Sequence, residues 1–296
     1  KHMIKSMTGF GRGEYSDGGR NVTVEIRSVN HRYGDITVKM PRRYSFAEET
    51  VKTAVKDVVK RGKADVSVMV DTLTEGDLTV RLNEPAAAQY MENLRALQKK
   101  HRLAGEIDIA LLSSMPDVLR TVPDVEDEKS VKEAVGRAAA QAAEAIDAMR
   151  IAEGGKLAED LMMRGRLIRD IVRQIGERAP QIAGEYVMKM KERIAELLDG
   201  AVEIPEERIL TEAAIFADKS NITEELVRLD SHMQQLGQIL TKAEDPAGKK
   251  LDFLVQEMNR EANTIGSKAN DLEITSWMLE TKSEIEKIRE QVQNIE

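Results

Sequence analysis

The sequence predicts an α+β protein, in which a small mixed α/β N-terminal domain is followed by long helices and a C-terminal helical domain. Before residue 83, apolar and polar residues alternate in several short runs, as they do in half-buried strands. After residue 84, apolar residues recur every three or four positions, which is typical of amphipathic helices. Aromatic residues make up only 3% of the chain and charged residues 32%, a composition that favours helices with much exposed surface.

The alternating runs predict four strands with one helix between them. The helix is expected over residues 45–61, where valines and alanines have helical spacing and Gly62 follows. The order of strands, helix and strands indicates a compact α+β unit. The predicted strands cover residues 22–26, 36–40, 66–70 and 78–82.

Three regions are expected along the chain. They are an N-terminal α+β domain with trailing helices over 3–122, a long helical arm over 123–204 and a C-terminal helical region over 205–296. The arm contains a helical pattern from 129 to 178, with Gly154 and Gly155 as its expected break and Pro180 as its expected end. A helix of about 50 residues would span roughly 75 Å, so we expect an arm or a contact between subunits.

Charge is distributed unevenly along the chain. The whole sequence carries a net charge of −8, but residues 3–82 hold 14 Lys and Arg against 11 Asp and Glu. Arg27, Asn30, His31 and Arg32 are gathered near a strand end in this basic region. Guanidinium groups suit phosphate oxygens and an imidazole can stack on an unpaired base, which predicts a surface for a polyanion. An ordinary polar hairpin is the alternative interpretation.

Several protein classes are excluded or disfavoured. The chain has no cysteine, which excludes disulfides and thiolate metal sites and fits a reducing cytoplasm. No apolar run approaches the roughly 20 residues that cross a bilayer, and the first residues are too polar for a signal peptide. Neither a GxGxxG fingerprint nor a GxxxxGK[ST] loop is present, so nucleotide-binding folds receive no support. We therefore expect a cytoplasmic protein without a membrane partner.

The C-terminal region predicts three amphipathic helices, each with one apolar seam. Three apolar seams and a long arm offer more apolar surface than one copy of the chain is expected to bury. We therefore expect a stable homo-oligomer with an even number of subunits. The seams consist of Leu226, Leu229, Met233, Leu236 and Leu240; of Leu251, Leu254, Met258, Ala262, Ile265 and Ala269; and of Ile274, Trp277, Thr281, Ile285, Ile288, Val292 and Ile295.

Polar residues beside these seams predict a metal site. Glu225 and His232 are seven residues apart on one helix, and Glu257 and Glu261 are four apart on the next, so each pair shares a helix face. Carboxylates and an imidazole on neighbouring helices can bind a divalent cation, whose bound water becomes a nucleophile. Two other interpretations stay open. Glu225 with Arg228 is an ordinary surface ion pair in one, and the nearby row of amides is a register-fixing layer in an oligomer in the other. The amides are Gln256, Asn259, Asn263 and Asn270.

Two blocks of motifs lie at the two ends of the chain. The N-terminal motifs are Ser6-Met-Thr-Gly-Phe-Gly-Arg12, Glu25-Ile-Arg-Ser-Val-Asn-His-Arg-Tyr33 and Arg61-Gly-Lys63. The C-terminal motifs are Asp218-Lys219, Glu224-Glu-Leu-Val-Arg-Leu229, His232, Leu251-Asp-Phe-Leu-Val-Gln-Glu-Met-Asn-Arg-Glu261 and Asn263-Thr-Ile-Gly-Ser-Lys268. With these motifs the sequence resembles the YicC/YloC family of bacterial endoribonucleases, over the whole chain from Met3 onward.

The resemblance implies a divalent-metal-dependent endoribonuclease that hydrolyses RNA phosphodiester bonds as a clamp-like homo-oligomer, expected to be a homohexamer. Mn²⁺ or Mg²⁺ is the implied cation. A non-catalytic RNA-binding or scaffold oligomer is the alternative. A hydrolase of small phosphoesters is disfavoured, because few aromatic residues are available to line an apolar pocket. The expected roles are Glu225, His232, Glu257 and Glu261 as cation ligands, Arg228 and Arg260 as catalytic phosphate contacts, and Arg27, Asn30, His31, Arg32 and Lys268 as RNA contacts.

Two residues depart from the family pattern. Asn221 occupies a position where relatives usually have an aspartate, so a carboxylate ligand there would be lost, although asparagine caps a helix as well as aspartate does. Gly34 occupies a position where relatives tend to have a bulky apolar residue, beside the Asn30 to Arg32 group. Neither change removes Glu225, His232, Glu257 or Glu261.

Overall fold

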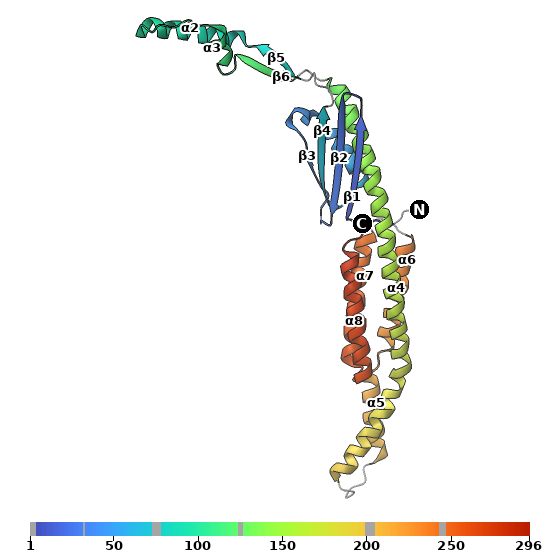
Figure 1. The fold of residues 1–296 in the computed structure, drawn as a ribbon. Helices are drawn as coiled ribbons and strands as arrows, with labels where there is room; N and C mark the ends of the chain where they lie inside the picture. Colours follow the sequence, from blue (N-terminus) through green and yellow to red (C-terminus); the bar gives the residue numbers. More distant parts are fainter. Residues whose placement is uncertain (1–3, 32, 73–77, 124–126, 199–204, 243–246) are drawn as a thin grey trace.

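The computed structural model describes residues 4–31, 33–72, 78–123, 127–198, 205–242 and 247–296. It is an elongated molecule in which one very long helix runs beside a small sheet and then beside a helical bundle (Figure 1). The predicted α+β class is therefore confirmed. The N-terminal elements are β1 (Gly9–Ser16), β2 (Arg20–Val29), β3 (Asp35–Lys39), a 3-10 helix (Arg42–Ala47), α1 (Glu48–Val58) and β4 (Lys63–Thr72). Then follow β5 (Leu78–Leu82), α2 (Glu84–His101), α3 (Ile109–Ser114), β6 (Leu119–Pro123), α4 (Glu128–Leu198), α5 (Glu206–Lys219), α6 (Thr223–Lys242), α7 (Ala247–Lys268) and α8 (Leu272–Val292).

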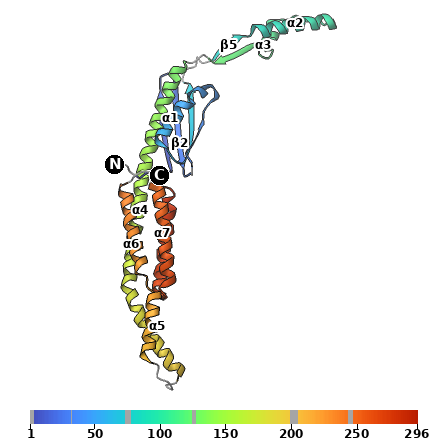
Figure 2. The same cartoon turned by 180° about the vertical axis from the view of Figure 1, so that it is seen from behind.

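The N-terminal sheet has the strand order β1-β2-β4-β3. Strands β1, β2 and β4 are antiparallel neighbours, and β3 joins the edge parallel to β4. Val24 and Ile26 of β2 and Val66 of β4 lie on the covered face, where α1 and the first part of α4 bury them. The views from both sides show these two helices on one face of the sheet, with the other face open (Figure 2). The predicted strands from 22 to 70 and the helix between them are confirmed.

Strand β1 has no counterpart among the predicted strands. Its covered positions are glycines, so the alternation of apolar side chains that marks a strand is missing. A Cβ atom at Gly11 would lie 2.2 Å from the Ala142 carbonyl oxygen, and one at Gly13 would lie 2.2 Å from that of Ala138. The glycines and the alanine-rich face of α4 therefore allow strand and helix backbones to pack directly against each other.

Helix α4 is longer than the sequence predicts, with 71 residues. The expected break at Gly154 and Gly155 is wrong, since α4 continues through both residues. A Cβ at Gly154 would lie 2.1 Å from the Ile4 carbonyl oxygen. This glycine makes room for the N-terminal segment instead of ending the helix. The expected end at Pro180 is also wrong. Proline removes one helical hydrogen bond, while Ile175 and Ile182 on either side of it are buried in the bundle core.

Strands β5 and β6 form a two-stranded antiparallel sheet that carries α2 and α3. These four elements form a projection that extends away from the N-terminal sheet (Figure 1). The predicted strand 78–82 is confirmed, whereas β6 was not expected. Helices α2 and α3 bury none of their residues in the part of the chain that the structure describes.

The second half of α4 packs with α6, α7 and α8 into the helical bundle. All residues of the three predicted seams are buried there except Trp277, which is half-buried. The seams are therefore covered within one copy of the chain, and they no longer supply a reason for oligomerisation. In the described residues, no helix is apolar over a length that would cross a membrane.

One buried arginine joins the sheet to the bundle. Arg150 of α4 is fully buried and donates hydrogen bonds to the carbonyl oxygens of Ser6, at 2.6 Å, and Val58, at 3.1 Å. It also pairs with the carboxylate of Glu296. Ser6 in turn forms a β-bridge with Ile295, so both ends of the described chain meet at the sheet–bundle junction.

Candidate metal centre on the helical bundle

The candidate centre lies between two neighbouring bundle helices, α6 and α7. Leu229 and Met233 on α6, and Met258 and Ala262 on α7, are buried in the bundle core and fix how the two helices are rotated. Since His232 is adjacent to Met233 in sequence, this packing also positions the imidazole. The apolar seams thereby decide which polar side chains come together.

His232, Glu257 and Glu261 form one group. Each offers one nitrogen or oxygen atom, and these three atoms all lie within 4.8 Å of one another. Bonds from a divalent cation to such ligands are about 2.0–2.3 Å long, so ligands on opposite sides of an ion are about 4–4.6 Å apart. The group therefore has nearly the dimensions of a coordination sphere.

Glu261 and one ring nitrogen of His232 are buried and have few partners among the described residues. Glu261 is only 3% exposed, yet its nearest cation in the described chain is the Nη1 atom of Arg228, 3.8 Å from its Oε1 atom. The Nδ1 atom of His232 is buried and has no hydrogen-bond partner among the described residues. A buried nitrogen without a partner is costly unless something else occupies the position in front of it. A cation with imidazole and carboxylate ligands would satisfy both groups.

Two arginines flank the group. Arg228 pairs with Glu224 at 2.5 Å and reaches Glu261 at 3.8 Å, while Arg260 lies 3.4 Å from Glu257. The Arg228 and Arg260 side chains are 47% and 65% exposed, so both guanidinium groups can reorient toward an anion from solvent. Both predicted phosphate contacts therefore lie beside the predicted ligands.

Glu225 lies outside the group. Its buried carboxylate accepts a hydrogen bond of 2.7 Å from the Nζ atom of Lys268. Burial alone would raise the pKa of Glu225, but the hydrogen bond and charge of Lys268, with smaller help from Arg228 and the backbone, lower it overall. Among the described residues, the group of ligand atoms within 4.8 Å of one another includes His232, Glu257 and Glu261 but not Glu225. Three of the four predicted ligands are thus brought together.

Asn221 accepts a hydrogen bond from the backbone of Thr223 at 3.0 Å and so stabilises the start of α6. The predicted capping role therefore does not depend on an aspartate.

The N-terminal candidates for RNA binding are separate from this centre. Arg27 lies on the open face of the sheet, with its guanidinium carbon 5.6 Å from the ring centre of Phe10. Asn30 donates a hydrogen bond of 2.9 Å to the Gln293 carbonyl oxygen, which is a contact between sheet and bundle. The Nδ1 atom of His31 lies 3.1 Å from the Tyr33 carbonyl oxygen, and Arg32 is outside the described residues.

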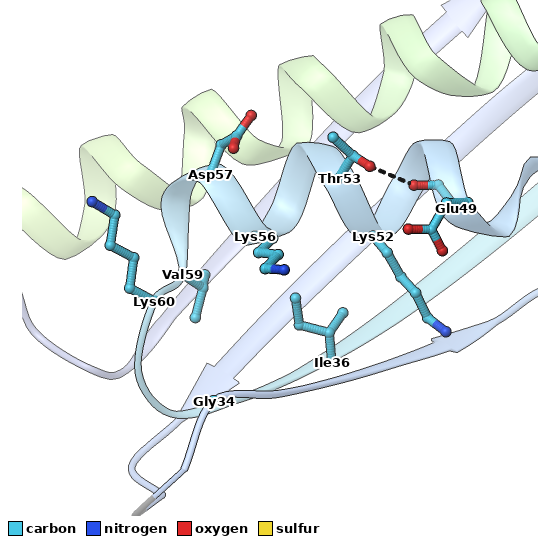
Figure 3. A pocket seen from close by; sticks show the side chains of 9 residues that line it. All are labelled: Gly34, Ile36, Glu49, Lys52, Thr53, Lys56, Asp57, Val59 and Lys60. Carbon is cyan, nitrogen blue, oxygen red and sulfur yellow. Dashed lines mark hydrogen bonds between the residues drawn. The ribbon is translucent and has the colours of Figure 1, made fainter.

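A basic groove beside α1 had no role in the sequence analysis. It has a volume of about 750 Å³ and lies between α1 and β3 (Figure 3). Lys52, Lys56 and Lys60 line it at intervals of four residues. The spacing of Lys52 and Lys56 was a signal available in the sequence, because four residues return to nearly the same face of a helix, whereas Lys60 follows the end of α1 at Val58.

The fold and the candidate site define an elongated α+β protein with a histidine–carboxylate centre on a helical bundle. Comparison with known sequences gives the family. Residues 4–159 match the N-terminal region of the YicC-like endoribonucleases, and residues 175–296 match their C-terminal domain. The chain belongs to the YicC-like endoribonuclease family.

Two relatives are similar along their whole length. A protein of Clostridioides difficile named "Probable endoribonuclease YicC" is 43% identical over 294 residues, covering 99% of this chain and 100% of the relative. A protein of the same name from Haemophilus influenzae is 31% identical over 299 residues, again covering 99% of this chain and 100% of the relative.

Proposed function

We propose that this protein is a divalent-metal-dependent endoribonuclease that hydrolyses phosphodiester bonds in RNA. The observation that supports the proposal most strongly is the group of His232, Glu257 and Glu261, with a buried imidazole nitrogen that has no partner in the described chain. Membership in the YicC-like endoribonuclease family supports the RNA substrate. Of the two cations, Mn²⁺ is expected to bind this set of ligands more tightly than Mg²⁺, because imidazole favours the softer ion.

The residues of this chain have distinct tasks in the proposed reaction. A bound cation supplies an acidified water and neutralises charge on the phosphate. His232, Glu257 and Glu261 would hold it, and their places on two packed helices keep them preorganised. Arg228 and Arg260 would bind the non-bridging phosphate oxygens, where negative charge increases during attack. Hydrolysis adds one water across a P–O bond, so the attacking water loses a proton and the leaving oxygen gains one.

Removal of single ligands tests the centre. We expect Glu257→Gln, Glu261→Gln and His232→Ala each to lower Mn²⁺-dependent cleavage of a mixed-sequence RNA about 100-fold or more. Without metal, the melting temperature of the two Gln variants should be unchanged or slightly higher, because like charges at i,i+4 repel each other. Titration calorimetry with Mn²⁺ should show weaker binding in all three.

Glu280→Gln on α8 is the matched control, because Glu280 is exposed and lies on a different helix. It should retain full activity and Mn²⁺ affinity. Full activity in all three site variants would disprove the centre. RNA that binds the protein but stays intact with Mn²⁺, Mg²⁺ or chelator alike would support the scaffold alternative instead.

We further propose that the protein acts as a homo-oligomer, and that the projection formed by β5, α2, α3 and β6 supplies the contact. Its helices bury no residue in the described chain, yet it carries apolar side chains that are half or more exposed. Apolar surface of this kind on an extended element is typical of an interface, and a second copy is the simplest partner. The exposed residues include Val80, Leu82, Leu103, Ile109 and Leu119.

A further inference from the structure

We propose that the groove between α1 and β3 binds the phosphate backbone of an RNA strand and directs it toward the bundle. The inference extends the proposed function, because it assigns a path for the same substrate on a surface away from the metal centre. The groove is lined on the α1 side by Lys52, Lys56 and Lys60 together with Glu49 and Asp57, and on the opposite side by Ile36 and Gly34 (Figure 3).

The ammonium groups in the groove differ in their availability. Lys52 pairs with Glu48 at 2.7 Å, which leaves it partly neutralised. Lys56 and Lys60 are exposed and form no ion pair within the described residues. In Figure 3 the side chain of Lys56 points toward Ile36. Glu49 and Asp57 also line the groove, so its three lysines outnumber its carboxylates by one. Lys56 and Lys60 are the lysines available to an anion.

The backbone around the groove adds to its fit for an anion. Strand β3 is the edge of the sheet, so its outer side has no strand partner in the described part of the molecule. A Cβ at Gly34 would lie 2.8 Å from the Lys60 carbonyl oxygen, so only glycine lets the start of β3 approach the end of α1 this closely. The start of β3 and the end of α1 are thereby held close together at the Lys60 end of the groove.

The distribution of charge favours the groove over the open sheet face as the binding site for an RNA strand. Residues 39–63, which form the surroundings of the groove, contain eight Lys and Arg against three Asp and Glu. On the open sheet face, by contrast, Arg27 is the register partner of Asp65 on β4, and Glu25 lies two residues away on the same face of β2. A polyanion is attracted by the first surface much more than by the second.

The groove leads toward the proposed metal centre. Its Lys60 end is continuous with Arg61, whose backbone N–H donates to Glu296 at 2.7 Å and whose Nη1 atom lies 3.4 Å from the Cβ position of Gly248. Gly248 is in the first turn of α7, the helix that carries Glu257 and Glu261. Ten residues of helix correspond to about 15 Å, so a few nucleotides would connect the groove to the centre.

The test removes the two unpaired charges. Lys56→Gln combined with Lys60→Gln should weaken binding of an unstructured RNA of about 20 nucleotides roughly tenfold in chelator, measured by fluorescence anisotropy. The slope of log affinity against log salt should decrease by about 1.4, since each lost contact to a single strand contributes about 0.7. With Mn²⁺ present, the KM for this RNA should increase while kcat changes little, because the groove contacts lie away from the scissile bond.

Lys189→Gln combined with Lys191→Gln on α4 is the control, because it removes the same charge from exposed lysines elsewhere. Equal affinity losses in both double variants, or none in either, would overturn the groove proposal. So would a groove variant that keeps its RNA affinity but loses binding of poly-glutamate, since the groove would then take acidic protein segments. If the wild-type protein cleaves no RNA, the proposed activity fails, and the groove is still decided by the binding data.

Discussion

At the scale of single residues, Glu225 and His232 show how similar positions on one helix acquire different chemistry. They are seven residues apart on α6 and both face the side of α7. Glu225 receives a hydrogen bond from Lys268, so its buried charge is neutralised within the chain. His232 faces two carboxylates and its Nδ1 atom has no partner in the described chain. The first arrangement stabilises the fold, and the second is the one that the proposed cation would complete.

The Glu225–Lys268 pair predicts a pH-dependent contribution to stability. The folded-state pKa of Glu225 is lowered from its ordinary value of 4.5. Its stabilisation is therefore fully present above that pH and is lost as the pH falls through the lowered folded-state pKa. We expect Lys268→Gln to reduce the free energy of unfolding by about 1–2 kcal/mol at pH 7, a value that allows for solvent screening of the half-exposed lysine.

Melting temperatures measured between neutral and strongly acidic pH check this prediction. The difference between wild type and Lys268→Gln should shrink toward zero once Glu225 is protonated in both proteins. Lys242→Gln, at the exposed end of α6, should change stability by less than about 0.5 kcal/mol at any pH. A constant difference across the pH series would show that Lys268 acts through packing and not through Glu225.

At the scale of elements, the contact of β1 with α4 depends on the absence of side chains. The two backbones approach so closely that a methyl group at Gly11 would overlap the Ala142 carbonyl oxygen. Helix and strand are both rigid there, so neither can move away without disturbing the core that they share with β2 and α1.

Glycine-to-alanine substitutions at two positions should therefore have opposite effects. Gly11→Ala should lower the free energy of unfolding by about 1–3 kcal/mol, because the added methyl group meets fixed backbone atoms. Gly155→Ala should raise it by about 0.5–1 kcal/mol, since Gly155 is exposed within α4 and a Cβ there meets nothing within 4 Å. Denaturant unfolding of both variants measures the two signs, and a stabilising Gly11→Ala would contradict the close approach.

At the scale of the whole molecule, one helix organises two separate cores. The first part of α4 packs on the sheet and the second part packs in the bundle, so the two cores have a common rigid axis (Figure 1). Arg150 and the Ser6–Ile295 bridge lie where these cores meet. In the described chain, helices α2 and α3 of the projection bury none of their residues, and the projection extends away from the sheet (Figure 1).

The projection predicts the state of assembly. Light scattering at micromolar concentration should return a mass that is an even multiple of 33.1 kDa, with six copies expected. Leu82→Ser combined with Ile109→Ser should lower that mass, because it places hydroxyl groups in the proposed interface. Leu272→Ser combined with Leu279→Ser, at exposed apolar positions of α8, is the control and should leave the mass unchanged. A monomeric wild type would rule out the proposed assembly.

Much of the fold and part of the site could be predicted from the sequence. Strands β2, β3, β4 and β5, helix α1 and the three seams followed from the spacing of apolar residues, because that spacing reports which face of an element is buried. The proximity of Glu257 to Glu261 followed from helical geometry, and their proximity to His232 from the seams that pack α6 against α7.

By itself, then, the sequence determined the α+β class, the seams and the face of each helix that carries the candidate ligands, since these depend on periodicity along the chain. Only the tertiary structure decided that Lys268 neutralises Glu225 from 43 residues away, and that Gly11 and Gly154 admit another backbone. It also decided that α4 continues through Pro180. These features depend on what packs opposite a residue, and periodicity along one segment carries no information about a partner that comes from another.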